Sequence, residues 1–143
     1  MEDNIKKETI RRLINQSKLA VLSTITPENT SESAVVEISA RDNLELIFDT
    51  LPTFRKYKNL NNNQNVSVVI GWEPATIQYE GIATELTGDV LEEYKQIHFM
   101  KFPEAVKFEK LGIKFFKIIP RWIRYTDVSR QPWEIFEVEF PVS

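Results

Sequence analysis

The chain has 143 residues, of which 42% are hydrophobic and 27% charged, as is typical of one globular domain. Lys and Arg number 18 and Asp and Glu number 21, and this net charge of −3 argues against a nucleic-acid-binding protein, which usually carries a basic excess. The absence of cysteine excludes disulfides and thiolate nucleophiles, and one histidine, His98, cannot form a multi-histidine metal centre. No apolar run is long enough to span a membrane, and residues 1–7 lack a signal-peptide core, so we expect a cytoplasmic protein without a membrane partner.

Three segments have the patterns of helices. Apolar residues at helical spacing predict a first helix over residues 5–14, with Asp3 or Asn4 as its cap. A short helix is expected over residues 54–61, with Thr53 as its cap, and a longer helical segment over residues 91–111 is interrupted by a proline.

Alternating and β-branched runs separated by short turns predict the strands. These strands cover residues 19–25, 33–38, 44–50, 66–70, 76–90, 113–119, 122–128 and 134–140. Gly81 allows a bend or bulge in the long fifth strand, and Pro120 separates the sixth strand from the seventh. The short connections favour antiparallel pairing, because parallel strands need a crossover of about a dozen residues. We therefore predict a single α+β domain over residues 1–143, whose sheet closes or nearly closes into a small barrel.

Three cations, Arg55, Lys56 and Lys58, lie in the first turns of the short central helix. Cations at a helix N-terminus oppose the helix dipole at a cost of about 0.3–1 kcal/mol each, whereas the free backbone N–H groups there attract anions. A phosphate at this terminus would accept those hydrogen bonds and pair with Arg55 and Lys56, which would reconcile the two effects. The alternative interpretation is a basic helix face exposed to solvent.

Other polar and aromatic residues carry weaker signals. Glu37 and Glu80 could act as an acid–base pair, but solvent-facing positions on an antiparallel sheet explain them more simply. His98 is interpreted as a packed or surface residue. Because no side chain is an evident acid or base, no catalytic residue is assigned. Three tryptophans are expected at element edges, either around a flat aromatic ligand or dimer interface or at ordinary barrel ends. These are Trp72, Trp122 and Trp133.

The order and spacing of several segments resemble a known family. The segments are residues 19–24, 32–36, 46–50, 55–60, 65–72, 76–83 and 116–127. Together they make residues 5–140 similar to the pyridoxamine-phosphate-oxidase-like, FMN-binding split-barrel proteins. The resemblance implies a six-stranded antiparallel split barrel with flanking helices that forms a homodimer, with two FMN molecules at the dimer interface.

The resemblance also implies roles for individual residues. Arg55 and Lys56 correspond to the phosphate contact of the family's Arg-Lys-x-x-Asn-Leu block. Many relatives have Ser or Thr directly before this pair, where this chain has Phe54, so Thr53 is the substitute hydroxyl. The remaining expected contacts are Thr50, Ser33, Ala34, Val35 and Val36 on the flavin and ribityl side, and Gln78 and Trp122 near the isoalloxazine ring or the interface.

The resemblance suggests the general-stress or flavin-reductase-like branch of the family. The chain lacks the Arg-rich C-terminal substrate-binding tail expected of a true pyridoxamine-phosphate oxidase. We expect an FMN-dependent oxidoreductase that passes a hydride to or from a small substrate, with NAD(P)H as a candidate electron donor. The alternatives are a non-catalytic flavin or nucleotide carrier or sensor, a haem- or deazaflavin-binding barrel in which His98 is the sole imidazole, and a cofactor-free structural barrel.

Overall fold

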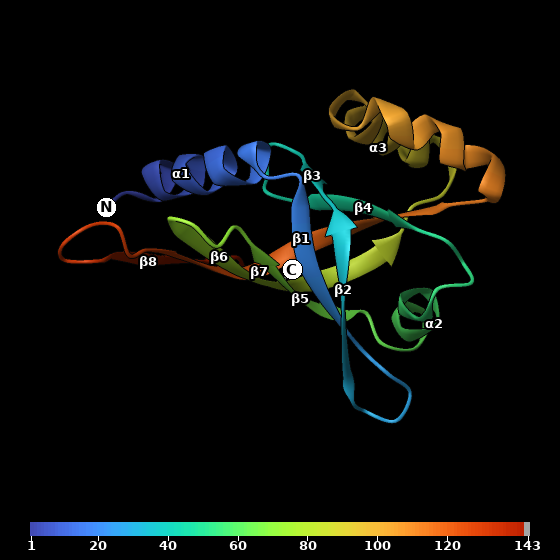
Figure 1. Ribbon diagram of the computed structural model, residues 1–143, viewed down its shortest axis with the longest axis horizontal. Coiled ribbons are helices and arrows are strands. Elements are labelled where there is room, and N and C mark those ends of the chain that lie inside the picture. The colour runs from blue at the N-terminus through green and yellow to red at the C-terminus, as the bar shows by residue number, and fades with distance from the viewer. Residues whose placement is uncertain (142–143) are drawn as a thin grey trace.

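The computed structural model describes residues 1–141 and shows one curled antiparallel sheet flanked by helices (Figure 1). The strand order is β2-β1-β5-β6-β7-β4-β3, and β8 pairs with β7 beside this path. The strands are β1 (Leu19–Ile25), β2 (Ser31–Glu37), β3 (Ser39–Ala40), β4 (Leu46–Thr50), β5 (Asn65–Ile70), β6 (Ala75–Glu85), β7 (Lys114–Asp127) and β8 (Glu134–Glu139). The α+β half-barrel is confirmed. The sheet has eight strands, whereas the resemblance implied six. The sequence pattern predicted β8, but it divided β7 into two strands and did not indicate the two-residue β3.

The sheet is split between β2 and β4. After β2 the chain passes through Ile38 into β3, which forms a hairpin with β4 on the other side of the sheet. The curl brings β2 close to β4, although no pairing joins the two strands within residues 1–141. The split therefore leaves the edge of β2 open.

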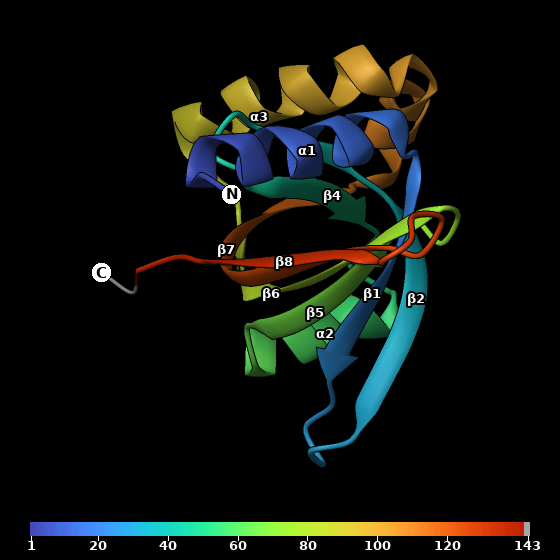
Figure 2. The ribbon, with the colours of Figure 1, turned by 90° about the vertical axis from the view of Figure 1, so that its left-hand side faces the viewer.

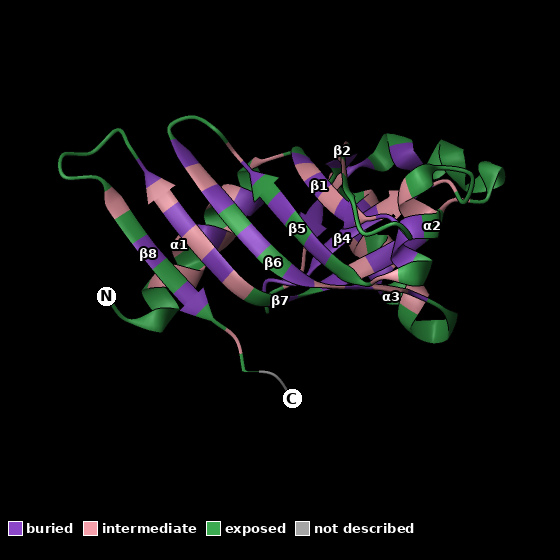
Figure 3. Cartoon of the chain, turned by 90° about the horizontal axis from the view of Figure 1, so that it is seen from below, coloured by how far each residue is buried: buried purple, intermediate pink, exposed green. Residues whose placement is uncertain are grey.

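The core fills the inside of the curl. Residues of β5 alternate between buried and exposed, with Val66, Val68 and Ile70 facing inward (Figure 3). The same period of two along β6 places Ile77 and Tyr79 in this core. The hydrophobic alternation that predicted these strands therefore also sets which face is buried.

Helices cover both ends of the curl. Helices α1 (Asp3–Gln16) and α3 (Gly88–Lys101) lie together on one side, and α2 (Arg55–Asn62) lies on the opposite side (Figure 2). A 3₁₀ helix, η1 (Pro103–Leu111), follows α3 where the sequence predicted an interruption.

Neither α1 nor α2 has a side-chain cap. The N-cap residues are Glu2 and Phe54, so the predicted capping by Asp3, Asn4 or Thr53 is wrong.

Strand β7 is continuous, so the predicted break at Pro120 is wrong. Pro120 lies between Ile118, the last residue that pairs with β4, and Trp122, the first that pairs with β8. Its missing N–H therefore costs no ladder hydrogen bond on that side. The predicted irregularity at Gly81 is confirmed, because the β6–β7 register shifts between Glu80 and Gly81.

Within residues 1–141, no helix is both long enough and apolar enough to cross a membrane.

Candidate functional site

Three adjoining pockets form one groove along the split between β2 and β4. Their volumes are about 440, 370 and 290 Å³. The first pocket shares Glu32 and Arg55 with the second, and Phe54 and Lys56 with the third. The N-terminus of α2 thus lies at the centre of this continuous space, which we call the split groove.

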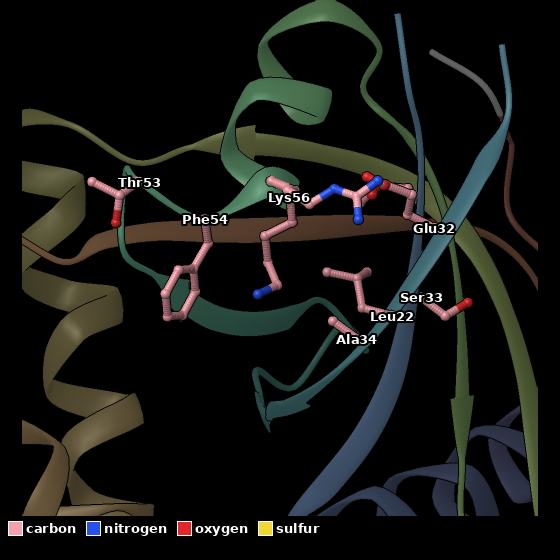
Figure 4. Close-up of a pocket in the computed structure, with 9 residues that line it drawn as sticks. Leu22, Glu32, Ser33, Ala34, Thr53, Phe54 and Lys56 are labelled. Atoms are coloured by element: carbon pink, nitrogen blue, oxygen red, sulfur yellow. The ribbon is translucent and has the colours of Figure 1, made fainter. Parts of the chain in front are cut away.

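The two predicted phosphate ligands both line the split groove, but in different environments. The Arg55 side chain is 85% exposed and pairs with Glu32. Lys56 lies over the Phe54 ring, with its Nζ atom 4.9 Å from the ring centroid, and its side chain points into the pocket (Figure 4). Burial lowers the pKa of Lys56, while the negative charge of Asp49 acts in the opposite direction. Lys58, the third cation, lines the groove beside Arg55.

Two carboxylates, Glu32 and Asp49, face these cations, and each lies beside a buried polar side chain. Asn59 is 3% exposed, and its Nδ2 donates hydrogen bonds to Glu32 Oε1 at 2.6 Å and Thr24 Oγ1 at 3.0 Å. Asp49 Oδ2 lies 3.4 Å from Nε2 of His98, which is fully buried. The Glu32 carboxylate is therefore fixed in the groove by a hydrogen bond, whereas Asp49 only lies near His98, whose Nε2 has no hydrogen-bond partner among the described residues.

The third pocket has apolar walls. Phe54, Phe108 and Leu111 line it from α2 and η1, and each is between 43% and 54% exposed. Val35 lines the opposite side from β2 and is 63% exposed. Such a concentration of exposed apolar side chains in a cleft is typical of a site for a flat apolar ligand or for a partner surface.

The other predicted residues of this region lie along the groove in varied ways. Thr50 is buried, and its hydroxyl donates to the carbonyl of Leu51 at 3.1 Å. Thr53 lines the first pocket although it does not cap α2. Ser33 points away from Lys56 (Figure 4), and its Oγ lies 2.8 Å from Ser23 Oγ. Ala34 lines the first pocket, and Val36 lines the third while packing into the core.

Gln78 and Trp122 do not line the split groove. Their register partners place them on the outer face of the sheet, where Gln78 lies beside Val69 and Arg124. Trp122 Nε1 donates to Glu137 Oε1 at 2.9 Å. The structure therefore separates these two residues from the pair Arg55 and Lys56 within one chain.

The glutamates of the acid–base alternative are exposed to solvent, and the three tryptophans lie outside the split groove. Glu37 and Glu80 are both solvent-exposed, as the simpler interpretation predicted. Trp72 and Trp133 are exposed at 63% and 56% and line none of the three groove pockets. Trp122 lies inside β7 rather than at a strand edge, because β7 is continuous.

His98 is a packed residue, as expected. Its Nδ1 lies 2.7 Å from Ser39 Oγ, and its ring packs against Phe102 and Phe115. Because it has no exposed surface, it could ligate a haem iron only after α3 moved away from the sheet. Across the described part of the chain, no group of three or more His, Cys, Asp or Glu side chains could hold a metal ion.

Sequence reasoning missed Glu32, Asp49 and Phe108 as groove residues. They lie on three separate elements, β2, β4 and η1, and no local sequence pattern indicates that these elements meet. One signal was available for Asp49, which is the only charged residue in the apolar run of residues 46–50. A charge in such a run indicates a position that faces a cleft or solvent.

Comparison with known proteins assigns the family. The family model described as pyridoxamine 5'-phosphate oxidase matches residues 7–127. The chain belongs to this family. None of the curated proteins matches it significantly.

Several solved structures share the fold of this chain. General Stress Protein 26 from Bacillus anthracis is 22% identical with a TM-score of 0.70, over 93% of this chain and 98% of that one. A pyridoxamine 5'-phosphate oxidase-related, FMN-binding protein from Nostoc punctiforme is 9% identical with a TM-score of 0.69, over 99% and 98%. A heme-binding protein from Mycobacterium smegmatis is 15% identical with a TM-score of 0.81, over 93% of this chain and 57% of that one.

The residues of the split groove fit FMN in kind. Arg55, Lys56 and the free N–H groups of the first turn of α2 suit a phosphate, and the walls formed by Phe54 and Phe108 suit a flat ring. The fit in charge is less favourable. Among the described residues that line the groove, carboxylates outnumber cations. The cations are Arg55, Lys56 and Lys58, and the carboxylates are Glu28, Glu32, Glu37 and Asp49.

Proposed function

We propose that the protein is a cytoplasmic, homodimeric FMN-binding flavoprotein that acts as an oxidoreductase on a small substrate. The observation that carries the proposal is the position of Arg55 and Lys56 at the N-terminus of α2, where both line a groove with apolar walls. Charge-assisted hydrogen bonds to a phosphate are among the strongest that a protein makes. A flavin mononucleotide combines such a phosphate with a flat apolar ring.

Each part of the groove has a defined task in this proposal. Arg55, Lys56 and the Thr53 hydroxyl hold the phosphate, while Phe54, Phe108 and Leu111 cover the ring and exclude water. Bound FMN supplies the hydride-transfer chemistry, so the chain needs only to bind and orient the reactants. NAD(P)H is the proposed electron donor.

The outer face of the sheet supports the homodimer. Val35 and Val69 flank Val21 in one row across β2, β1 and β5, and they are 63% and 40% exposed. Gln78 continues this row, and Trp122 lies in the next one. A second copy of the chain on this face would cover the valines and bring Gln78 and Trp122 into the interface, where a flavin at the split would meet both chains.

The phosphate assignment is tested by an FMN titration followed by flavin fluorescence. The double variant Arg55→Ala/Lys56→Ala should bind FMN at least about 100-fold more weakly, because each charge-assisted hydrogen bond contributes about 1.5–3 kcal/mol. Arg12→Ala/Lys18→Ala is the matched control, since it removes the same two charge types at exposed positions away from the groove. Equal FMN affinity in the double variant and the wild type would contradict the assignment.

Turnover separates the enzyme from the carrier or sensor. The FMN-loaded protein should oxidise NADH or NADPH in the presence of an electron acceptor. Flavin that stays bound without turnover would favour the carrier or sensor instead. Parallel titrations with a deazaflavin and with haem, the latter read by its Soret band, compare the remaining cofactor classes.

A further inference from the structure

We propose that Glu32 determines ligand specificity by occupying the Arg55 guanidinium, so that it weakens the binding of dianionic phosphate ligands and leaves neutral flavins unaffected. This inference rests on the proposed function, because it concerns the same groove. The difference in affinity between FMN and riboflavin should therefore be smaller than Arg55 and Lys56 would produce without Glu32.

The carboxylate of Glu32 is held in place by a buried neighbour, Asn59. Its side chain is only 18% exposed, and the buried Asn59 amide holds one carboxylate oxygen at 2.6 Å. Asn59 is itself held by Thr24 at 3.0 Å. The second carboxylate oxygen faces Arg55, and within residues 1–141 Glu32 is the side chain with which Arg55 forms an ion pair.

The two cations at the start of α2 therefore differ. Arg55 is paired in the free chain, whereas Asp49 acts on Lys56 only through space, without an ion pair. A phosphate at this terminus would meet Lys56 directly but would have to replace Glu32 at Arg55. Once replaced, Glu32 would remain beside the phosphate, because Asn59 holds it there and both Glu32 and Arg55 line the same two pockets.

The balance of charge makes this competition costly for an anion. Among the described residues, four carboxylates and three cations line the groove, so the net charge of its lining does not attract a dianion. A neutral ligand such as riboflavin uses the apolar walls of the third pocket and does not depend on Arg55. The carboxylate of Glu32 therefore sets the difference in affinity between the two flavins.

The test compares FMN and riboflavin on the wild type and on Glu32→Gln. Glutamine keeps an oxygen for the Asn59 hydrogen bond and removes the charge, and thermal unfolding verifies that the variant is folded. Glu32→Gln should tighten FMN binding by about tenfold and change riboflavin binding by less than about twofold, because it removes one like-charge contact with the phosphate. Glu104→Gln is the control for net charge, since Glu104 is 92% exposed and lines none of the groove pockets.

Two results would overturn the proposal. One is FMN affinity in Glu32→Gln that is equal to or weaker than in the wild type, and the other is an equal gain for riboflavin and FMN. If neither flavin binds either protein, the proposed function fails, and the role of Glu32 is then read from titrations with inorganic phosphate. In that case NMR should show the amide signals of α2 shifting at a lower phosphate concentration in Glu32→Gln than in the wild type. Shifts at the same phosphate concentration in both proteins would overturn the proposal.

Discussion

Lys101, the last residue of α3, joins that helix to the end of α1. Its Nζ donates hydrogen bonds to the carbonyl oxygens of Ile14 at 3.1 Å and Ser17 at 2.5 Å. A cation at the C-terminus of α1 also interacts favourably with the helix dipole. Burial nevertheless lowers the pKa of Lys101 to about 8, because the charged form loses contact with water.

This lowered pKa predicts how stability depends on pH. Between about pH 8 and pH 10.5 the unfolded chain holds more protons on Lys101 than the folded chain, so the free energy of unfolding should rise with pH. The expected contribution is about 1–3 kcal/mol, and Lys101→Met should remove it while keeping the apolar stem. Urea unfolding of both proteins at several pH values measures the difference between them. The same pH dependence in both would show that Lys101 does not cause the rise.

The residues alone indicated only the part of the candidate site whose signal is local, while the resemblance added Ala34, Val35 and Thr50, which also line the groove. Arg55 and Lys56 were found because cations at a helix N-terminus form a pattern within a few residues. Glu32 and Asp49 were missed because they lie on β2 and β4, and only the curl of the sheet brings these strands together. Gln78 and Trp122 were assigned by resemblance, and their places on the outer face follow from strand register.

At the scale of elements, β6 and β7 form the longest ladder of the sheet, and Gly81 lies where it is irregular. A Cβ atom at Gly81 would lie closer to the carbonyl oxygen of Ile119 than real Cβ atoms do, and 2.9 Å from Cγ2 of Ile118. The glycine is therefore required by the close approach of the neighbouring strand rather than by a turn.

Gly81→Ala should destabilise the protein by about 1–3 kcal/mol, because the backbone of β7 must shift to admit the methyl group. Chemical denaturation measures this change. Gly88→Ala is a useful comparison, because no atom lies within 4 Å of the added Cβ there, although the φ of +69° adds backbone strain. A Gly81→Ala protein as stable as the wild type would contradict the assigned close approach.

Most elements were predictable because their burial pattern matches their geometry. The alternation in β5 and the helical spacing of Ile10 and Ile14 in α1 are visible in the sequence. The break at Pro120 was predicted wrongly because its tolerance depends on which neighbours β7 has at that point. The short β3 has too few residues to show any period.

At the scale of the whole molecule, the exposed valine row predicts the oligomeric state. Light scattering should give a mass near twice 16.7 kDa. The double variant Val35→Lys/Val69→Lys should be monomeric, because two charges would be buried in the interface without partners.

Val90→Lys is the matched control, since Val90 is 48% exposed on α3, away from this face. The control should remain dimeric. A wild-type protein that binds FMN as a monomer would contradict both the proposed interface and a cofactor site shared between two chains.

The split between β2 and β4 also bears on the order of folding. The curl depends on pairings between distant segments, such as Phe48 with Phe116 and Ala20 with Ile70. Such contacts form late, since the entropy of closing long loops must be overcome first. In the described part of the chain no ladder joins β2 to β4, so their approach depends on all these pairings being complete. The groove is therefore among the last parts to acquire its native shape, and a ligand that bridges it would slow unfolding more than it would speed folding.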